Sequence, residues 1–445
     1  MDEGASNLQA RLGRPRDEWT VDDLTAVARD LGIRLVSLLH VGGDGLLKTL
    51  DFAPRTEQRL RRILAGGERA DGSSLFAGLR AGASDIVLRP RPQTAFLDPF
   101  APAATLCVLC GHHGRDDRPL PESPDTIVRQ ADQRLREQTG ARLEALGEIE
   151  FFLGRFATDA DAHCTSDGGY HATAPFVHGE DLRRRALLCL AEMDIPVKYG
   201  HAEVGYIDAS APGGLIWEQH EVELDLLPLA RAADAIVLAQ WVIRNLARRE
   251  GLQCSMEPVV GPGHAGNGLH VHFAFAGDGR HEPVLDSDGQ MREPARWLTA
   301  GLTELAGALM AFGNRSNASF VRLDQGKESP TRLDWGLHDR HALVRVPLVP
   351  ADADAPAPTV EFRLPDGSAH PHLLLAAAAQ AMCHGRQSAK ADGLGAPSEA
   401  TLPRSGPEIA AALERRRQSL QHGGVFPAAL IDALADRLRA GAPPA

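Results

Sequence analysis

The sequence predicts an α+β protein with two domains. At 445 residues the chain is longer than one hydrophobic core usually organises. The first hundred residues mix short strand-like runs with turns, whereas from Asp125 onward long helical patterns alternate with strands. The proline-rich stretch 118–125 separates these two kinds of sequence pattern, because proline favours extended chain before a helix. We therefore expect a flexible N-terminus at 1–18, a first domain at 19–117 and a second at 118–445.

The first domain combines short strands and turns. Residues 33–41 and 46–52 are apolar strand-like runs, and the GGDG sequence between them predicts a turn. A third apolar run, 104–111, contains Cys107 and Cys110, which a strand would direct to opposite faces. No second CxxC completes a zinc site, so a buried strand explains this pair better than a redox or metal motif.

The second domain is expected to be layered. Helical patterns occur at 125–143, 180–193, 226–250, 295–312 and 369–387. Strand-like segments lie between these helices, which is the arrangement of a domain that packs helices on a sheet. The chain shows no internal repeat.

Charge and hydropathy exclude several classes of partner. Lys and Arg total 47 and Asp and Glu total 59, which gives a formal net charge of −12. This acidic balance argues against a nucleic-acid partner. The sequence shows neither an apolar signal-peptide core nor a segment long enough to span a membrane. Its six scattered cysteines are compatible with a reducing compartment, so we expect a cytoplasmic protein with no membrane partner.

Strand-like segments with ionisable residues two apart are the most informative pattern. In a strand such residues lie on one face, while apolar residues occupy the other. The segments are Glu148-Ile149-Glu150, His201-Ala202-Glu203, Glu221-Val222-Glu223, His270-Val271-His272 and Glu361-Phe362-Arg363. One such segment would suit a solvated strand, but glutamates that share a strand face repel unless a cation lies between them. Because Mg²⁺ and Mn²⁺ prefer oxygen ligands with an occasional imidazole, we expect a polar-lined sheet that holds more than one divalent ion.

Two phosphate-binding motifs match only in part. Residues 261–266 satisfy GxGxxG, but a strand-like segment follows instead of the helix that a dinucleotide fold requires. Gly326-Lys327 is followed by Glu328 instead of the Ser or Thr of a P-loop. Arginines among apolar residues offer another way to bind phosphate or carboxylate, namely Arg315, Arg322, Arg332, Arg340, Arg345 and Arg363. Divalent ions together with such arginines imply phosphoryl transfer.

Ten motifs follow one another in a characteristic order. They are DGSS (71–74), SDIVLRP with TAFLDPF (84–100), GEIEFFL (147–153), GGY (168–170), HAEV with QHEVEL (201–224), GNGLHVHF (266–273), RLDQGKESP (322–330), HDRHALVRVP (338–347), VEFRLPD (360–366) and GGVFPAALID (423–432). With these motifs the chain resembles prokaryotic-type glutamine synthetase from about residue 20 to about residue 440. The resemblance implies an N-terminal β-grasp domain, a large catalytic domain with a curved antiparallel sheet flanked by helices, and a homo-oligomeric ring. Such rings are usually stacked hexamers whose active sites lie between subunits.

By position, the resemblance also implies a role for individual residues. One divalent ion, near the nucleotide phosphates, would be held by Glu148, His270 and Glu361, and the other by Glu150, Glu203 and Glu221. The transferring phosphate of ATP would contact His272, Arg340 and Arg345. Glutamate would be bound by Gly266, Arg322 and Arg363.

The ammonia site is implied in the same way. Asp71 of an adjacent subunit would take a proton from ammonium, and Glu328 matches the flap glutamate of the family. Ser74, Tyr170 and Glu203 would complete the ammonium cage with them. The implied reaction is ATP-dependent formation of a γ-glutamyl amide from glutamate and ammonia through γ-glutamyl phosphate.

Two alternatives remain open. The connector between Glu203 and Glu221 is longer than is usual in the family, so a primary amine such as methylamine, ethanolamine, a polyamine or an aromatic amine could replace ammonia. Its pocket would then be shaped by Tyr206, Ile216 or Trp217. Lys198 stands where the family commonly has an acid and Ala265 where it has an asparagine; these departures suggest a non-catalytic, ring-forming relative as the second alternative.

Overall fold

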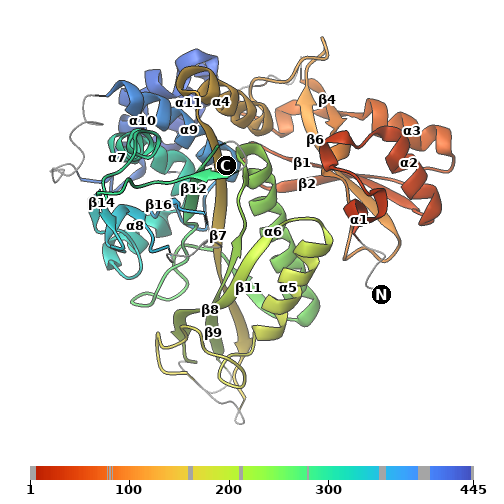
Figure 1. The fold of residues 1–445 in the computed structure, drawn as a ribbon. Coiled ribbons are helices and arrows are strands. Elements are labelled where there is room, and N and C mark those ends of the chain that lie inside the picture. Colours follow the sequence, from red (N-terminus) through yellow and green to blue (C-terminus); the bar gives the residue numbers. More distant parts are fainter. Residues whose placement is uncertain are drawn as a thin grey trace. The chain divides into compact units, whose positions relative to one another are not determined.

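The structure is a computed structural model of the chain. It describes residues 7–77, 79, 82, 84–158, 164–209, 214–277, 280–349, 357–388 and 401–441. The chain divides into two compact units, which are coloured along the sequence in Figure 1. One unit comprises residues 1–126 and 188–196, and the other comprises 127–187 and 197–445. No helix in the described part of the chain is both long and apolar enough to cross a membrane.

The first unit contains a sheet that has six strands within the described residues, in the order β2-β1-β6-β4-β3, with β5 paired to β6. The strands are β1 (Leu35–Val41), β2 (Leu47–Phe52), β3 (Glu68–Asp71), β4 (Asp85–Pro90), β5 (Phe96–Leu97) and β6 (Thr105–His113). Strand β1 is parallel to β6 and antiparallel to β2. The helices are α1 (Leu8–Leu12), α2 (Val21–Asp30) and α3 (Glu57–Gly66), with short 3-10 turns η1 (Arg16–Glu18), η2 (Gly72–Ser74) and η4 (Pro92–Thr94).

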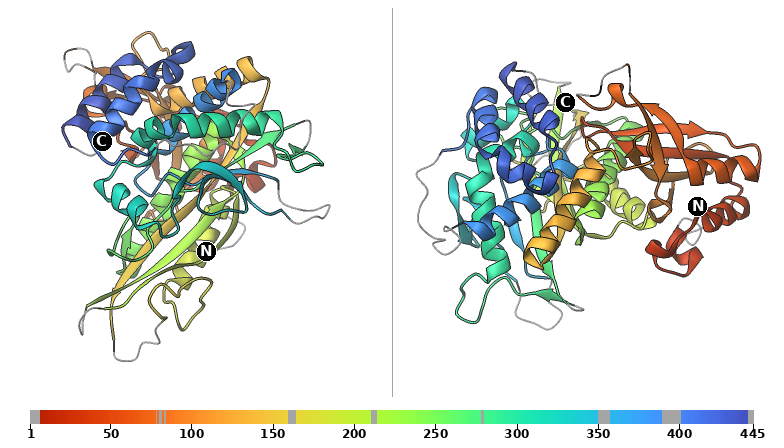
Figure 2. Two further views of the ribbon diagram at one scale, coloured as in Figure 1. Left: turned by 90° about the vertical axis from the view of Figure 1, so that its left-hand side faces the viewer. Right: turned by 90° about the horizontal axis from the view of Figure 1, so that it is seen from above.

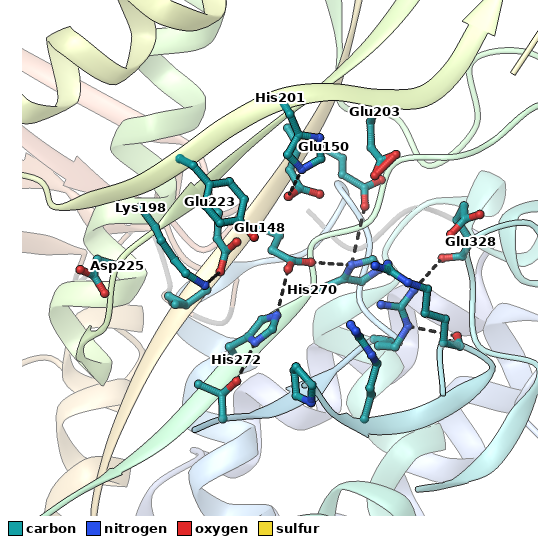
Figure 3. Close-up of a pocket in the computed structure, with 18 of the residues that line it drawn as sticks. Glu148, Glu150, Lys198, His201, Glu203, Glu223, Asp225, His270, His272 and Glu328 are labelled. Carbon is teal, nitrogen blue, oxygen red and sulfur yellow. Dashed lines mark hydrogen bonds and ion pairs between the residues drawn. The ribbon is translucent and has the colours of Figure 1, made fainter. Parts of the chain in front are cut away.

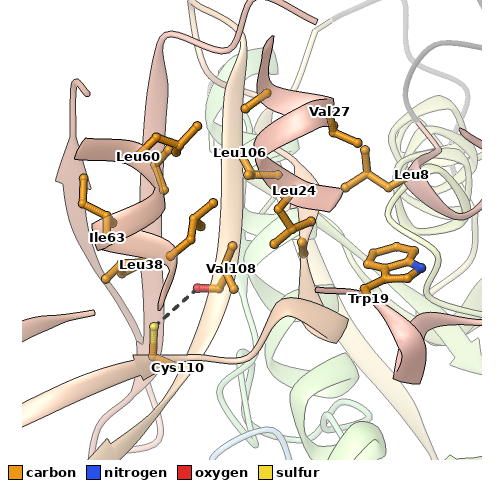
Figure 4. Packing of buried hydrophobic residues seen from close by; sticks show 14 of the residues in the cluster. Leu8, Trp19, Leu24, Val27, Leu38, Leu60, Ile63, Leu106, Val108 and Cys110 are labelled. Atoms are coloured by element: carbon orange, nitrogen blue, oxygen red, sulfur yellow. Dashed lines mark hydrogen bonds between the residues drawn. The ribbon is translucent and has the colours of Figure 1, made fainter. Parts of the chain in front are cut away.

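Helices α2 and α3 bury their apolar faces against β1 and β6 (Figure 4). The core contains Leu24 and Val27 from α2, Leu60 and Ile63 from α3, Val36 and Leu38 from β1, and Leu106, Val108 and Cys110 from β6. The strand residues in this core are two apart, as the alternation of side chains along a strand requires. Cys107 and Cys110 are both buried and free, which confirms the predicted buried strand.

Residues 8–18 differ from the expected flexible segment. Helix α1 is capped by Asn7, whose side chain accepts a hydrogen bond from the Ala10 amide. Leu8 is 1% exposed and belongs to the core of this unit. The Arg16 guanidinium pairs with Asp194 at 3.0 Å. A capped turn, a buried leucine and an ion pair therefore hold a segment whose composition alone suggests a free end.

The second unit is built on a sheet with ten strands among the described residues, in the order β14-β15-β16-β12-β7-β9-β8. Its main strands are β7 (Arg142–Phe156), β8 (Val197–Ile207), β9 (Leu215–Leu224), β12 (Val271–Ala276), β14 (Arg332–Leu337), β15 (Ala342–Val346) and β16 (Val360–Phe362). The short strands β10 (Leu227–Pro228) and β11 (Gln253–Ser255) pair with β7, and β13 (His281–Glu282) pairs with β12. In Figure 1 the long strands β7, β8 and β9 run side by side.

The predicted helices are confirmed with small shifts at their ends. They are α4 (Pro124–Thr139), α5 (Glu180–Glu192), α6 (Leu229–Glu250), α7 (Glu293–Gly313) and α9 (Pro371–Gln387), joined by α8 (Asn317–Gln325), α10 (Gly406–Gln421), the 3-10 turn η6 (His422–Gly424) and α11 (Ala428–Arg439). Helix α4 ends before Gly140, which has a φ of 72° and so favours a helix end. Helix α6 begins after Pro228 instead of at residue 226, since proline suits the start of a helix and not its interior.

Helix α6 fixes one face of β7 and leaves the other for the site. A Cβ at Gly147 would lie 2.9 Å from the Ile236 side chain, so the helix packs directly on the strand at that point. Ile149 is on the same face as Gly147 and is 1% exposed. Glu148 and Glu150 therefore point to the opposite face.

Helices α7 and α9 pack closely through small residues. A Cβ at Gly301 would lie 1.8 Å from the Ala381 carbonyl oxygen, so no larger residue fits there. A Cβ at Gly385 would likewise lie 1.9 Å from the Trp297 carbonyl oxygen. Figure 2 shows α7 (teal) packed with the C-terminal helices (blue) in both views. The close approach at Gly301 and Gly385 therefore fixes how α7 and α9 pack in the second unit.

Candidate active site

Strand register brings the predicted acids to one face of the larger sheet. In the antiparallel pair of β7 and β9, Glu148 is opposite Glu223 and Glu150 is opposite Glu221. In the pair of β8 and β9, His201 is opposite Glu221. Strand β12 lies on the other side of β7 and adds His272, while His270 immediately precedes this strand. Figure 3 shows Glu148, Glu150, His201, Glu223, His270 and His272 gathered in a pocket.

A cavity of about 580 Å³ covers this face. Of the predicted site residues, its lining includes Glu148, Glu150, Tyr170, Glu203, Glu221, Gly266, His270, His272, Glu328, Arg340, Arg345 and Arg363. Glu361 and Arg322 are not among the lining residues, because they are buried, at 0% and 1% exposed. Asp71 and Ser74 belong to the first unit.

The first metal set predicted from the sequence, Glu148, His270 and Glu361, is assembled in the structure. One possible ligand atom of each residue lies within 4.8 Å of the others. The His270 Nδ1 atom is 2.9 Å from a Glu148 oxygen and 3.9 Å from a Glu361 oxygen. Burial alone would raise the pKa of Glu148, but the His272 and His270 imidazoles outweigh burial and hold that pKa well below its usual range. Glu148 is therefore a carboxylate at neutral pH, as a metal ligand must be.

The second set comes together in a slightly different form. Glu203 and Glu221 group with His201, which was not among the predicted ligands. Burial and then the Glu150 carboxylate raise the pKa of Glu203 to about 8. Burial and then Glu148 and Glu150 raise the pKa of Glu221 well above its usual value. Glu150 thus lies near both acids, while its Oε2 atom accepts hydrogen bonds from the Gly268 backbone amide at 2.7 Å and the Gln219 side-chain amide at 3.0 Å.

A third group was not predicted as a site. It consists of Glu148, His272 and Glu223. The Glu223 side chain is 1% exposed, and its Oε1 atom is 2.6 Å from the Lys198 ammonium. Its Oε2 atom has no hydrogen-bond partner among the described residues. Glu223 was visible in the two-apart pattern, but only the register between β7 and β9 shows that it faces Glu148.

Buried arginines surround the first metal set. Glu361 pairs with Arg363 and, at 2.7 Å, with Arg345. Burial lowers the pKa of Arg322, although a guanidinium stays charged at neutral pH. Its Nη2 atom is 3.2 Å from the His270 Nε2 atom and its Nη1 donates to the Leu364 carbonyl at 3.2 Å. Arg322 thus contacts a proposed ligand and not the cavity.

Tyr170 lines the cavity next to the second metal set. Its ring stacks on His171 at a centroid distance of 4.2 Å and meets the edge of His201 at 5.5 Å. Its side chain is half exposed. Burial and the Glu203 carboxylate raise the pKa of the phenol. The tyrosine is therefore a neutral hydrogen-bond donor beside an acidic group.

Asp71 is an exposed carboxylate in the first unit. It accepts hydrogen bonds from the hydroxyls of Ser73 at 2.7 Å and Ser74 at 2.8 Å. Hydrogen bonds from Ser84, Ser73 and Ser74 hold the pKa of Asp71 well below its usual range. Asp71 is therefore ionised at neutral pH and oriented by serines.

The long connector between Glu203 and Glu221 is an extended hairpin. Residues 204–207 continue β8 and residues 215–220 belong to β9, while 210–213 lie outside the described residues. Tyr206 and Ile216 are 0% and 1% exposed, and neither they nor Trp217 lines the cavity. Trp217 packs over Gly154 instead. The idea that these three residues shape an amine pocket is therefore not supported by their positions.

Comparison with known proteins identifies the family. Residues 121–404 match the model of the glutamine synthetase catalytic domain, and residues 32–113 match that of the glutamine synthetase β-grasp domain. The chain belongs to the glutamine synthetase family. The family fold confirms the predicted β-grasp domain and the curved sheet with flanking helices.

Several members of the glutamine synthetase family are similar over most of their length. The glutamine synthetase of Vibrio cholerae is 30% identical over 413 residues, which cover 82% of this chain and 84% of the relative. That of Clostridium saccharobutylicum is 29% identical over 371 residues, with 82% and 79% covered. The cryo-EM structure of Plasmodium falciparum glutamine synthetase superposes with a TM-score of 0.79 at 19% identity, covering 95% of both chains. A structure described as apo GmaS without ligand gives a TM-score of 0.75 at 20% identity, covering 94% of this chain and 95% of that chain.

The donor set fits divalent metal ions, which glutamine synthetases typically bind together with ATP. Each of the three groups offers carboxylate oxygens and one imidazole, the ligands that Mg²⁺ and Mn²⁺ accept. Burial first, and then neighbouring carboxylates such as Glu150, raise the pKa values of Glu203 and Glu221, and a cation bound among these acids would offset both effects. The unpartnered oxygen of Glu223 provides a further ligand position.

Proposed function

We propose that the protein is an ATP-dependent ligase that forms a γ-glutamyl amide from glutamate and ammonia through γ-glutamyl phosphate. The proposal is carried by one observation: acid and histidine groups stand beside buried arginines at a single cavity. This combination suits phosphoryl transfer to a carboxylate, where negative charge must be neutralised at both reactants. Membership in the glutamine synthetase family supports the same reaction.

The metal-binding residues would act on the nucleotide side. Two divalent ions, Mg²⁺ or Mn²⁺, would be held by Glu148, His270 and Glu361 and by Glu203, Glu221 and Glu150, with His201 in reach of the second set. When bound, such ions neutralise the phosphate oxygens of ATP during transfer. His272, Arg340 and Arg345 line the same cavity and would orient the transferring phosphate.

Glutamate would be bound in the same cavity. The Arg363 guanidinium and the Gly266 backbone line it and suit the carboxylate and ammonium groups of an amino acid. Arg322 would act indirectly, because its Nη2 atom contacts His270 at 3.2 Å. It would hold that imidazole in the orientation that binds metal.

The second step needs a free amine. Ammonium must lose a proton before its nitrogen can attack the γ-carbonyl, and a carboxylate near the attacking nitrogen can accept that proton. Glu328, Glu203 and Tyr170 line the cavity and would form the cage. Members of the family form rings, and we propose a ring, with stacked hexamers as the expected form, in which Asp71 and Ser74 of a neighbouring subunit complete the cage.

A primary amine is the second candidate substrate. The rings of Tyr170, His171 and His201 form a group, and Tyr199 lies 5.9 Å from His201. Tyr170, Tyr199 and His201 line the cavity. Aromatic faces stabilise a substituted ammonium and contact its carbon chain. This group would accept methylamine, ethanolamine, a polyamine or an aromatic amine more readily than the buried residues of the hairpin would.

An assay of phosphate release tests these proposals. The protein is incubated with ATP, glutamate and Mg²⁺ or Mn²⁺, and ammonium, methylamine, ethanolamine, putrescine and aniline are compared as amine donors. The highest kcat/KM with ammonium supports the first proposal, and a clear preference for one amine supports the second. Absence of phosphate release with every donor contradicts both and favours a non-catalytic, ring-forming relative.

A further inference from the structure

The loop that carries Glu328 has an unusual backbone conformation. It covers residues 326–329, between α8 and β14. Gly326 has a φ of 63° and Glu328 a φ of 54°. Glycine adopts this left-handed conformation freely, but for glutamate it is uncommon and is kept only where the surroundings enforce it. The contacts of the loop therefore decide where the Glu328 carboxylate points.

Lys327 ties this loop to two others. Its ammonium lies 2.9 Å from an Asp167 oxygen and also donates to the Gly263 carbonyl. The other Asp167 oxygen is 3.1 Å from the Nδ1 atom of His264. Burial alone would raise the pKa of Asp167, but Lys327 and His264 lower it, so the carboxylate stays charged. Loops 165–172, 261–267 and 326–329 thus meet at one carboxylate.

The side of the loop that faces the site is also restrained. The Arg363 Nη2 atom donates to the Glu328 carbonyl at 3.3 Å. The Ser329 hydroxyl donates to the Arg322 carbonyl at 3.1 Å. Glu328 therefore lies in the chain between the Lys327–Asp167 contact and the Ser329 hydroxyl, which is fixed to the Arg322 carbonyl.

A second cavity lies along the same loop. It has a volume of about 390 Å³ and shares Glu328 and Arg340 with the main cavity. Lys327 and Asp167 line this second cavity and not the main one. Their side chains are 49% and 18% exposed, which places the contact at the border between the site and solvent.

An ion pair this exposed contributes little to folding and is made and broken easily. It therefore suits a latch better than a structural support. We propose that Lys327, Asp167 and His264 form a latch that closes the 326–329 loop over the amide-forming site, and that Lys327 and Asp167 are positioning residues for Glu328. This inference rests on the proposed ligase function.

The latch would protect the acyl phosphate from water. If the loop opens, water attacks the γ-carbonyl, a C–O bond forms, the bond to the phosphate oxygen breaks, and glutamate and phosphate are released without amide. The amine competes with water for the same carbon. Weakening the latch therefore raises the ratio of phosphate released to amide formed.

This ratio is the first measurement. In Asp167→Asn and in Lys327→Met it is expected to rise by about twofold to fivefold, the effect of losing an exposed ion pair. Lys327→Arg keeps the charge and should keep the parent ratio. Asp432→Asn is the matched control, because its pair with Arg417 has the same 2.9 Å separation and lies outside the cavity lining. An unchanged ratio in both latch variants overturns the positioning role.

Hydrogen exchange is the second measurement and does not depend on activity. Backbone amides of residues 326–329 should exchange about twofold to fivefold faster in Asp167→Asn than in the parent or in Asp432→Asn. Equal rates overturn the latch. If the parent makes no amide with any donor, the ligase proposal fails, and the exchange rates alone then decide whether the latch exists.

Discussion

Glu148 and Glu223 are directly opposite each other across β7 and β9, and only Glu223 is paired with a lysine. Two carboxylates in this position repel unless positive charge lies between them. Lys198 supplies that charge from β8, which lies on the other side of β9. His272 supplies a hydrogen bond to Glu148 at 2.9 Å. Lys198 and His272, which belong to the same sheet, therefore offset part of the negative charge of these two glutamates.

Replacing Lys198 by methionine should show that the stability of the sheet depends on this lysine. The variant leaves the buried Glu223 carboxylate without its cation, which we expect to cost about 1–2 kcal/mol of unfolding free energy. Urea unfolding of the metal-free protein measures the loss. The double variant Lys198→Met/Glu223→Gln removes the charge as well and should recover most of the stability. Equal stability of the parent and the single variant would show that Lys198 does not neutralise Glu223.

Without divalent ions, the protein should lose stability as the pH rises from about 4.5 to 8. The folded state raises the pKa of Glu203 from 4.5 to about 8 and raises that of Glu221 as well. Over this range the folded protein therefore binds protons that the unfolded chain has released, and the free energy of unfolding falls with pH. Thermal melts in EDTA across this range check the sign. A melting temperature that rises steadily from pH 5 to 8 would contradict it.

Binding of Mn²⁺ should release protons for the same reason. At pH 7 most of the Glu203 carboxyl is protonated, given a pKa of about 8, and a metal ion must displace that proton. Calorimetric titration in two buffers of different ionisation enthalpy should report release of about one proton or more per protein. If the measured binding enthalpy is the same in both buffers, no proton is released and the ion binds elsewhere.

Glu150→Gln should weaken metal binding without unfolding the sheet. Glutamine can still accept from the Gly268 amide, which Glu150 does at 2.7 Å, but it no longer contributes negative charge. We expect the half-saturating Mn²⁺ concentration to rise by about tenfold. Glu144→Gln is the control, since Glu144 lies on the same strand but outside the cavity lining. An equal effect in both variants would assign the change to β7 as a whole.

Glu328→Gln should reduce amide formation by about a hundredfold or more, the range of a lost acid–base group. The side chain is exposed and the substitution keeps its size, so secondary structure and assembly should be unchanged. Product formation by mass spectrometry and size-exclusion chromatography test the two parts separately. Full activity would remove Glu328 from the site.

Gly301→Ala should destabilise the second unit by about 1–3 kcal/mol through overpacking. The new Cβ would lie 1.8 Å from the Ala381 carbonyl oxygen, so α7 and α9 would have to separate. Gly66→Ala provides the comparison, because nothing lies within 4 Å of a Cβ there and Gly66 ends a helix. Equal denaturation midpoints would show that the helix pair can adjust.

Much of the site could be predicted because its residues follow strand periodicity. Glu148 and Glu150 are two apart on β7, and the alternation that marks them also places Ile149 against the core. Glu148, His270 and Glu361 were predicted as one metal set from their motifs, and the structure brings these three side chains close together. Helix positions followed from apolar periodicity, with the ends corrected by Gly140 and Pro228.

The rest depends on contacts that local sequence does not encode. His201 joins Glu203 and Glu221, and Lys198 meets Glu223, because of the register of β8 on β9. A shift of one residue in that register would turn these side chains to the other face. The 8–18 segment contacts Asp194, far along the chain. Such pairings become visible only when the fold is known.

The two acids of β7 also set a fixed spacing. A strand rises about 3.3 Å per residue, so the backbone anchors of Glu148 and Glu150 are about 6.6 Å apart whatever the surrounding loops do. Gly147, beneath Ile236, locks this segment against α6. The pleat of β7 therefore fixes the spacing of these two charges, and sequence changes in the loops around the cavity leave that spacing unaltered.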